Sequence, residues 1–126
     1  MAEYFLKVFL DESKEVDYEV IEFDETKQKR LEFYYENMNC GLIDIVGPGT
    51  GVEFVVDEEG VLASNNPIFI ARMDDMPEGD TFTIVGTFLV GMFNGVDETV
   101  GFSSVDSLDS RLGNHLQVGF TRKYTE

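Results

Sequence analysis

The segment Leu42–Gly60, LIDIVGPGTGVEFVVDEEG, constrains the fold more than any other part of this sequence. Its two apolar runs, Leu42–Val46 and Val52–Val56, are joined by the glycine-rich sequence GPGTG, and the second run ends in the acidic turn Asp57–Gly60. Short apolar runs that are rich in Val and Ile and are bounded by Gly, Pro or acidic residues are typical of β-strands. The segment therefore predicts a β-hairpin.

The glycine-rich sequence between these runs does not match a phosphate-binding motif. The dinucleotide fingerprint GxGxxG opens a helix, and the P-loop requires a Lys before its Ser or Thr; here a strand-like run follows and no such Lys is present. The range Leu42–Ala71 contains no Lys or Arg, so a bound anion would have no counter-charge nearby in the sequence. A hairpin connection is the favoured interpretation. A small-molecule or nucleotide-binding module is the alternative, and it requires Arg72 or Arg111 to fold close to the loop.

Further strands are predicted on both sides of this hairpin. Tyr4–Leu10 is aromatic and aliphatic, and Val16–Phe23 alternates apolar with acidic residues, so these two runs are expected to pair around the polar turn Asp11–Glu15. Thr81–Gly91 is apolar in both registers, which predicts a central strand covered on both faces. Gly86 divides this run and indicates a bulge or a close approach of backbone. The remaining segments are less distinct. A short strand is predicted at Val61–Ser64, Ile68–Met73 fits either a strand or one helical turn, and Gln117–Tyr124 fits either a final short strand or an extended tail.

An amphipathic helix is predicted over about residues 26–39. Asp24 or Thr26 is expected to be its N-cap, and Gly41 the left-handed residue after its end. The basic residues at its start are expected to make local ion pairs on a solvated face; they are Lys27, Lys29 and Arg30.

A second amphipathic helix is predicted over about residues 104–116, following the N-cap sequence Ser103-Ser104. With both helices, residues 1–126 are expected to form a single α+β domain. Its mainly antiparallel sheet would have five to seven strands and carry the two helices on one face.

The chain is strongly acidic, and this restricts its partners. It has 25 Asp and Glu against 9 Lys and Arg, a formal net charge of −16 at pH 7. Such a charge repels nucleic acid and anionic membranes and attracts basic surfaces, so direct binding to DNA, RNA or membranes is not expected. The densest run of acids extends from residue 11 to residue 25, where Lys14 is the one opposing basic residue before Lys27. We predict that the partner-binding residues are the acids of this run: Asp11, Glu12, Glu15, Asp17, Glu19, Glu22, Asp24 and Glu25.

Residues with catalytic or metal-binding chemistry are few. The one cysteine, Cys40, allows no intrachain disulfide and is expected to be a packing residue, and the one histidine, His115, lies near the end of the second predicted helix. A serine hydrolase would have to pair His115 with a serine of that helix or just before it: Ser103, Ser104, Ser107 or Ser110. A surface or helix-terminal role is the simpler interpretation of His115. No catalytic residue, cofactor or specific metal site is predicted, and a reducing compartment, the cytoplasm, is expected.

The order of features in residues 42–91 resembles a known family. After the glycine-bearing hairpin come VVDEEG at Val55–Gly60, then Asn66-Pro67, an acidic loop, and IVGT at Ile84–Thr87 followed by Leu89–Gly91. This pattern covers about two-fifths of the chain and is similar to the domain of unknown function 3846, small proteins of phages, plasmids and conjugative elements. The resemblance implies a mobile-element origin near antirestriction or host-takeover genes. It implies no established activity and no catalytic residues.

These observations predict a non-enzymatic acidic interaction protein, monomeric or homodimeric, that binds and modulates a basic host or defence protein. One form is a DNA mimic whose carboxylates occupy the basic groove of a nuclease, a repressor or a CRISPR effector, because complementary charge accelerates association. The alternatives are the nucleotide-binding module described above and an enzyme of unknown class. Acidity that serves only solubility is the simplest competing explanation.

Overall fold

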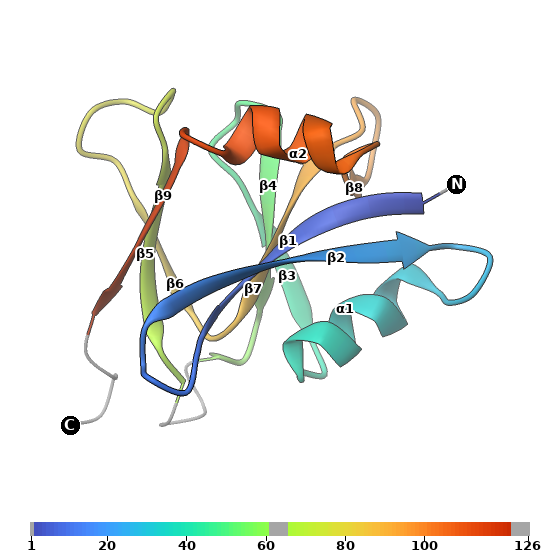
Figure 1. Ribbon diagram of the computed structural model, residues 1–126, viewed down its shortest axis with the longest axis horizontal. Coiled ribbons are helices and arrows are strands. Elements are labelled where there is room, and N and C mark those ends of the chain that lie inside the picture. Colours follow the sequence, from blue (N-terminus) through green and yellow to red (C-terminus); the bar gives the residue numbers. More distant parts are fainter. Residues whose placement is uncertain (1, 61–65, 122–126) are drawn as a thin grey trace.

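The computed structural model describes residues 2–60 and 66–121, which form two antiparallel sheets and two helices (Figure 1). The strands are β1 (Ala2–Leu10), β2 (Val16–Asp24), β3 (Ile43–Val46), β4 (Val52–Asp57), β5 (Ile68–Met73), β6 (Phe82–Val85), β7 (Phe88–Phe93), β8 (Thr99–Val100) and β9 (Leu116–Thr121). The helices are α1 (Arg30–Met38) and α2 (Val105–Leu112). The predicted α+β class with mainly antiparallel strands is confirmed. The short strand predicted at Val61–Ser64 lies outside the described residues.

β7 is the centre of the larger sheet, whose strand order is β2-β1-β7-β4-β3, with β8 also paired to β7. Its sequence FLVGMF is apolar in both registers and its first four residues are buried, as expected for a strand covered on both faces. The predicted hairpin at residues 42–60 is confirmed, since Ile43 pairs with Asp57 and Val46 with Phe54 on either side of GPGTG. This hairpin forms one edge of the larger sheet, and the β1–β2 hairpin forms the other.

A bend at Gly86 moves the chain from the smaller sheet, of order β6-β5-β9, to the larger sheet. The run predicted as one strand at Thr81–Gly91 is therefore two strands, and the division predicted at Gly86 is a change of sheet. Gly86 has a φ of +96°, a conformation that Gly adopts readily and that costs other residues free energy. Its N–H donates to the carbonyl of Pro67 at 2.8 Å.

Two apolar cores lie on opposite faces of the larger sheet. Alternate residues of a strand direct their side chains to opposite faces: Leu89 of β7 packs with Phe5 and Phe33, beneath α1, whereas Val90 packs with Leu108 of α2 and with the smaller sheet. The helices therefore cover opposite faces, and the prediction that both lie on one face is wrong. Each helix carries an apolar stripe that fits either face, so its own sequence does not select between them.

The first helix is shorter than predicted. It begins at Arg30 because the chain first makes a turn, in which the Asp24 carboxylate accepts hydrogen bonds from the N–H (3.0 Å) and the hydroxyl (2.7 Å) of Thr26. The residue before the helix provides no side-chain cap. At the other end the left-handed residue is Asn39, with a φ of 52°, and not Gly41. Asn tolerates this conformation because its short polar side chain can hydrogen-bond locally.

The second helix has the predicted N-cap and ends earlier than predicted. The Oγ of Ser104 accepts the N–H of Ser107 at 3.0 Å, which satisfies one of the free donors at the start of a helix. The helix ends at Leu112, and after a short turn the chain continues into β9. Neither helix in the described ranges is long and apolar enough to cross a membrane.

Candidate functional site

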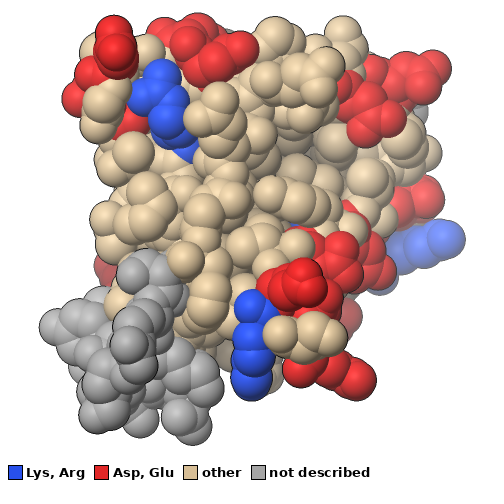
Figure 2. Space-filling view, turned by 60° about the vertical axis from the view of Figure 1, so that its left-hand side comes forward, with Lys and Arg blue, Asp and Glu red and all other residues tan. Residues whose placement is uncertain are grey.

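The predicted partner-binding acids lie along a two-stranded ribbon formed by β1 and β2, here called the β1–β2 ribbon. The strands pair over their whole length, from Ala2 opposite Asp24 to Leu10 opposite Val16. A strand of nine residues extends about 30 Å, so the eight acids are spread along the ribbon. On the face shown in Figure 2, Asp and Glu side chains likewise form separate groups around an uncharged centre.

The acids of β2 are divided between the two faces of the larger sheet. Ile21 packs toward α1, so Asp17 and Glu19 lie on that same face, and Glu22 and Asp24 lie on the other. The remaining predicted acids lie beyond the ends of the strand: Asp11, Glu12 and Glu15 at the hairpin turn, and Glu25 after β2.

The three aspartates of the β1–β2 ribbon hold its backbone in shape. Asp11 accepts two backbone N–H groups of the hairpin turn, at 2.8 and 3.0 Å. Asp17 accepts the N–H of its neighbour Tyr18 at 2.8 Å. Asp24 accepts the hydroxyl and the N–H of Thr26, and these hydrogen bonds hold the pKa of Asp24 below its ordinary value. Each aspartate thus has a local structural role.

The five glutamates among the predicted partner-binding acids have no such role. They are exposed, and their carboxylates form no hydrogen bond and no ion pair with the residues that the structure describes: Glu12, Glu15, Glu19, Glu22 and Glu25. The ion pairs within residues 2–60 and 66–121 use other acids, namely Glu3, Asp74, Asp75 and Glu98. Lys7 lies opposite Glu19 in the ladder but forms no ion pair with it. A basic partner would therefore meet carboxylates that are not engaged in ion pairs within the described residues.

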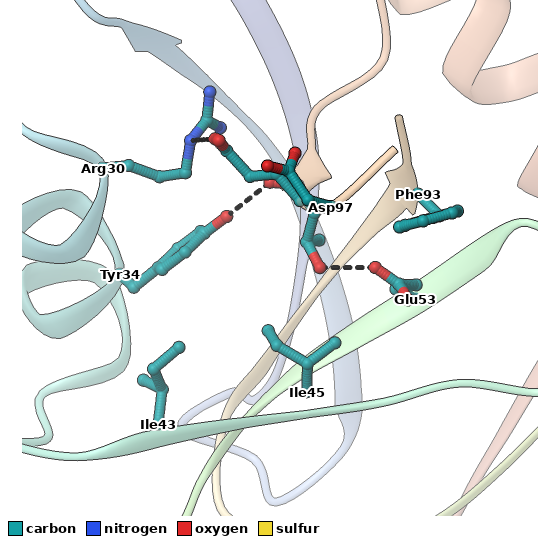
Figure 3. A pocket seen from close by; sticks show the side chains of 9 residues that line it. Arg30, Tyr34, Ile43, Ile45, Glu53, Phe93 and Asp97 are labelled. Atoms are coloured by element: carbon teal, nitrogen blue, oxygen red, sulfur yellow. Dashed lines mark hydrogen bonds and ion pairs between the residues drawn. The ribbon is translucent and has the colours of Figure 1, made fainter. Parts of the chain in front are cut away.

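A second feature is an open cleft of about 320 Å³ beside α1 (Figure 3). Side chains of α1, β3, β4, β7, β8 and the loop before β8 line it. Its charged and aromatic lining residues are Arg30, Tyr34, Glu53, Phe93, Asp97 and Glu98.

Arg30 is held in this cleft by carboxylates from two distant parts of the chain. Its guanidinium donates two hydrogen bonds to Glu3 of β1, both at 2.8 Å, and its Nε pairs with Glu98 at 2.9 Å. It also lies over the ring of Phe23, 4.7 Å from the centroid. The bonds to Glu3 raise the pKa of Arg30. Burial raises the pKa of Glu3, but the hydrogen bonds from Arg30 and from the Gly101 N–H outweigh it, so the pKa of Glu3 lies below its ordinary value.

A hydrogen-bond chain continues across the cleft. Tyr34 donates to the carbonyl of Thr99 at 3.3 Å, and the Thr99 hydroxyl donates to Glu53 (Figure 3). Burial raises the pKa of Tyr34 to about 12, so its hydroxyl stays protonated at neutral pH. Because two carboxylates already engage Arg30, the cleft has no free positive charge for an anion among its lining residues.

The GPGTG loop has an arginine close to it, as the nucleotide-binding alternative requires. Arg111 of α2 donates to the carbonyl of Thr50 at 3.3 Å, but the same nitrogen pairs with Asp75 at 3.0 Å, so its charge is compensated. Arg72 donates to three carbonyls of the loop between β5 and β6. The geometry therefore favours a hairpin connection fastened to α2 over a phosphate site.

Two of the residues considered for catalysis, His115 and Ser104, have structural partners. The Nδ1 of His115 lies 2.6 Å from the carboxylate of Asp74, and Ser104 is the helix cap. Burial, together with the nearby Asp57, raises the pKa of the Cys40 thiol, which disfavours the reactive thiolate. Within the described ranges, no three His, Cys, Asp or Glu side chains are grouped so that they could hold a metal ion.

No sequence signal identifies the Arg30 network. Glu3 and Arg30 are 27 residues apart, and Glu98 comes from a loop near the other end of the chain, so the three residues form no motif. The prediction of local ion pairs for the basic residues at the start of α1 is wrong for Arg30, whose ion pairs are long-range. Local pairs at helical spacing are the pattern that a sequence reveals.

Comparisons of the chain with protein-family models, with curated proteins and with solved structures found no match. The resemblance of residues 42–91 to the domain of unknown function 3846 therefore stays a prediction. The fold and the site define an acidic α+β protein with a two-stranded acidic ribbon at one edge of its larger sheet.

Proposed function

We propose that this protein is a non-enzymatic interaction protein that binds a basic partner protein through the β1–β2 ribbon. The observation that supports the proposal is the set of five exposed ribbon glutamates, which have neither an ion pair nor a hydrogen bond among the described residues. Complementary charge would speed the encounter and make the complex sensitive to salt.

A cytoplasmic protein with a Lys- and Arg-rich groove for nucleic acid is the partner class that matches this charge. Carboxylates two residues apart on one face of a strand, such as Asp17 and Glu19, are separated by about 7 Å. This is close to the axial distance of two phosphate steps along one DNA strand, which is about 7 Å. A partner of this class would bind the ribbon or DNA, but not both at one groove.

The experiment that tests the proposal compares two charge variants of equal net charge. The ribbon variant changes all five ribbon glutamates to Gln. The matched variant changes five exposed glutamates elsewhere to Gln: Glu32, Glu36, Glu58, Glu59 and Glu78. Each protein is immobilised and incubated with a bacterial lysate at low salt, and the retained proteins are quantified by mass spectrometry.

We expect basic nucleic-acid-binding proteins to be retained by the wild type and by the matched variant and to be lost from the ribbon variant. Salt at about 0.5 M should release them, because the Debye length then falls to about 4 Å, and duplex DNA should compete with them. Equal retention by both variants would show that net charge alone explains the binding, and the proposal would then be wrong.

A further inference from the structure

β2 leaves one edge of the larger sheet open. It is the last strand in the order and forms a β-ladder with β1 alone among the described strands, although β9 of the smaller sheet comes close to part of it. Tyr4 of β1 exchanges both backbone hydrogen bonds with Phe102, at 2.8 and 2.7 Å, so its N–H and C=O point away from β2. In an antiparallel ladder the residue opposite also directs its groups outward. Glu22 lies opposite Tyr4, so the N–H and C=O of Glu22 point to the open edge. Every second residue of a strand points its backbone groups the same way. The other residues of β2 with outward N–H and C=O groups are Val16, Tyr18, Val20 and Asp24.

The outward donors of β2 are only partly satisfied. Asp17 accepts the N–H of Tyr18, whereas the N–H groups of Val20 and Glu22 have no hydrogen-bond partner among residues 2–60 and 66–121. β3, at the opposite edge, has the same kind of side-chain hydrogen bond to an edge N–H, since Asp44 accepts the N–H of Ile45 at 2.8 Å. However, β3 has four residues and β2 has nine. A long open edge can pair with a strand of another chain.

The side chains along the first half of β2 alternate between acidic and apolar. Tyr18 and Val20 are 46% and 39% exposed and lie on one face of the sheet, whereas Asp17 and Glu19 lie on the other. An added strand would place its side chains beside these residues, face by face. Basic side chains would therefore suit the face of Asp17 and Glu19, and apolar side chains the opposite face.

A second copy of this chain does not suit the edge. β2 contains four acids and no basic residue, and two such strands side by side would lie about 5 Å apart, well within the Debye length of about 10 Å at 0.1 M salt. Like charges next to each other across two strands are destabilising. The charge of the edge thus favours a basic segment of another protein.

We propose that the open edge of β2 accepts an extended segment of the basic partner, in which Lys or Arg alternates with apolar residues, as an additional strand of the larger sheet. This proposal rests on the proposed function and adds the mode of binding. Main-chain hydrogen bonds would supply affinity, and the alternating side chains would supply selectivity. The incoming strand has to replace the bond between Asp17 and the N–H of Tyr18.

The test uses a synthetic peptide of nine residues, the length of β2, in which Lys alternates with Val and both ends are blocked. Its affinity is measured by calorimetry for the wild type, for Val20→Pro and for Val20→Thr. Pro removes the outward N–H of residue 20 and leaves the bonds to β1 intact, because edge strands tolerate Pro at such positions. We expect Val20→Pro to weaken binding about tenfold, and Val20→Thr, which keeps the N–H, to change it less than about twofold.

A second measurement needs no variant of the protein. The same peptide, N-methylated at alternate residues so that one edge cannot donate, keeps its charge and should bind the wild type about tenfold more weakly. Amide exchange of Val20 and Glu22 should slow when the unmodified peptide binds. If Val20→Pro and the methylated peptide both bind normally while the ribbon variant does not, strand addition is overturned and the proposed function stands. If the ribbon variant binds the peptide as tightly as the wild type does, strand addition and the proposed function are both wrong.

Discussion

Arg30 joins parts of the molecule that are distant in the sequence. Its guanidinium connects α1 to β1 through Glu3, to the loop before β8 through Glu98, and to β2 through the ring of Phe23. The side chains of Arg30 and Glu3 are only 19% and 20% exposed, so water screens their interaction less than it screens a surface ion pair.

We expect Arg30→Ala to lower the free energy of unfolding by about 2–3 kcal/mol, because it leaves the half-buried Glu3 carboxylate without its charged donor. The measurement is urea denaturation at pH 7. Lys29→Ala is the matched control, since Lys29 is exposed and should change the free energy by less than about 0.5 kcal/mol. Equal effects of the two substitutions would contradict a structural role for the Arg30 network.

The lowered pKa of Glu3 predicts a dependence on pH. A carboxyl whose pKa is lower in the folded state than in the unfolded state contributes stability above its unfolded pKa, about 4.5, and loses it as the pH falls through the folded value. The free energies of unfolding of the wild type and Glu3→Gln should therefore differ most at pH 6–7 and converge between about pH 5 and pH 3. Urea titrations across this range measure the difference, and a constant difference would exclude the assignment.

At this scale the sequence predicts individual residues only where their role is local. The N-cap Ser104 and the bend at Gly86 are confirmed because a cap and a positive φ depend on neighbouring residues. The Arg30 network depends on strands that meet only in the folded chain, so its members were not distinguishable from other surface charges.

Among the elements, β1 changes its neighbour partway along its length. Leu6, Lys7 and Val8 pair with β7, but Tyr4 pairs with Phe102, just after β8. The ring of Phe5 fills the space at this junction, against Gly91 of β7.

We expect Gly91→Ala to destabilise the fold by about 2–3 kcal/mol, because overpacking a filled core forces side chains or backbone to move. A Cβ at this position would lie 2.6 Å from the carbonyl oxygen of Val100 and 2.8 Å from the Phe5 ring. Gly41→Ala is the control, since nothing lies within 4 Å of its Cβ position. Thermal and urea denaturation of both variants measure the effect, and an unchanged Gly91→Ala protein would show that the junction is loosely packed.

The elements that the sequence predicts well are those defined by short-range pattern. Both hairpins, around Asp11–Glu15 and around GPGTG, are confirmed because a turn and two alternating runs lie next to each other in the chain. Long-range packing decides the two features that the sequence did not predict. These are the division of Thr81–Gly91 between two sheets and the placement of α1 and α2 on opposite faces of the larger sheet. Periodicity identifies an apolar face but not the surface that covers it.

Across the whole molecule, the net charge of −16 opposes folding. Like charges repel one another more strongly in the compact chain than in the unfolded chain, and few of the acids have a basic partner among the described residues.

We therefore expect the melting temperature to rise by a few degrees when NaCl is increased from about 0.05 to 0.5 M, because salt screens this repulsion. Scanning calorimetry measures the shift. The ribbon variant, with five fewer negative charges, should show a smaller rise and a higher melting temperature at low salt. A melting temperature that falls with salt would mean that attractive pairs outweigh the repulsion.

The pairing of β1 with β7 has a consequence for synthesis. Leu6 pairs with Val90, and at 5–20 residues per second a ribosome needs on the order of ten seconds to make the chain between them. During that interval the nascent β1–β2 hairpin has no strand on its inner side, and an isolated hairpin is at best marginally stable. We expect its carboxylates to repel neighbouring nascent chains on the same messenger RNA and so to disfavour their association before β7 is made.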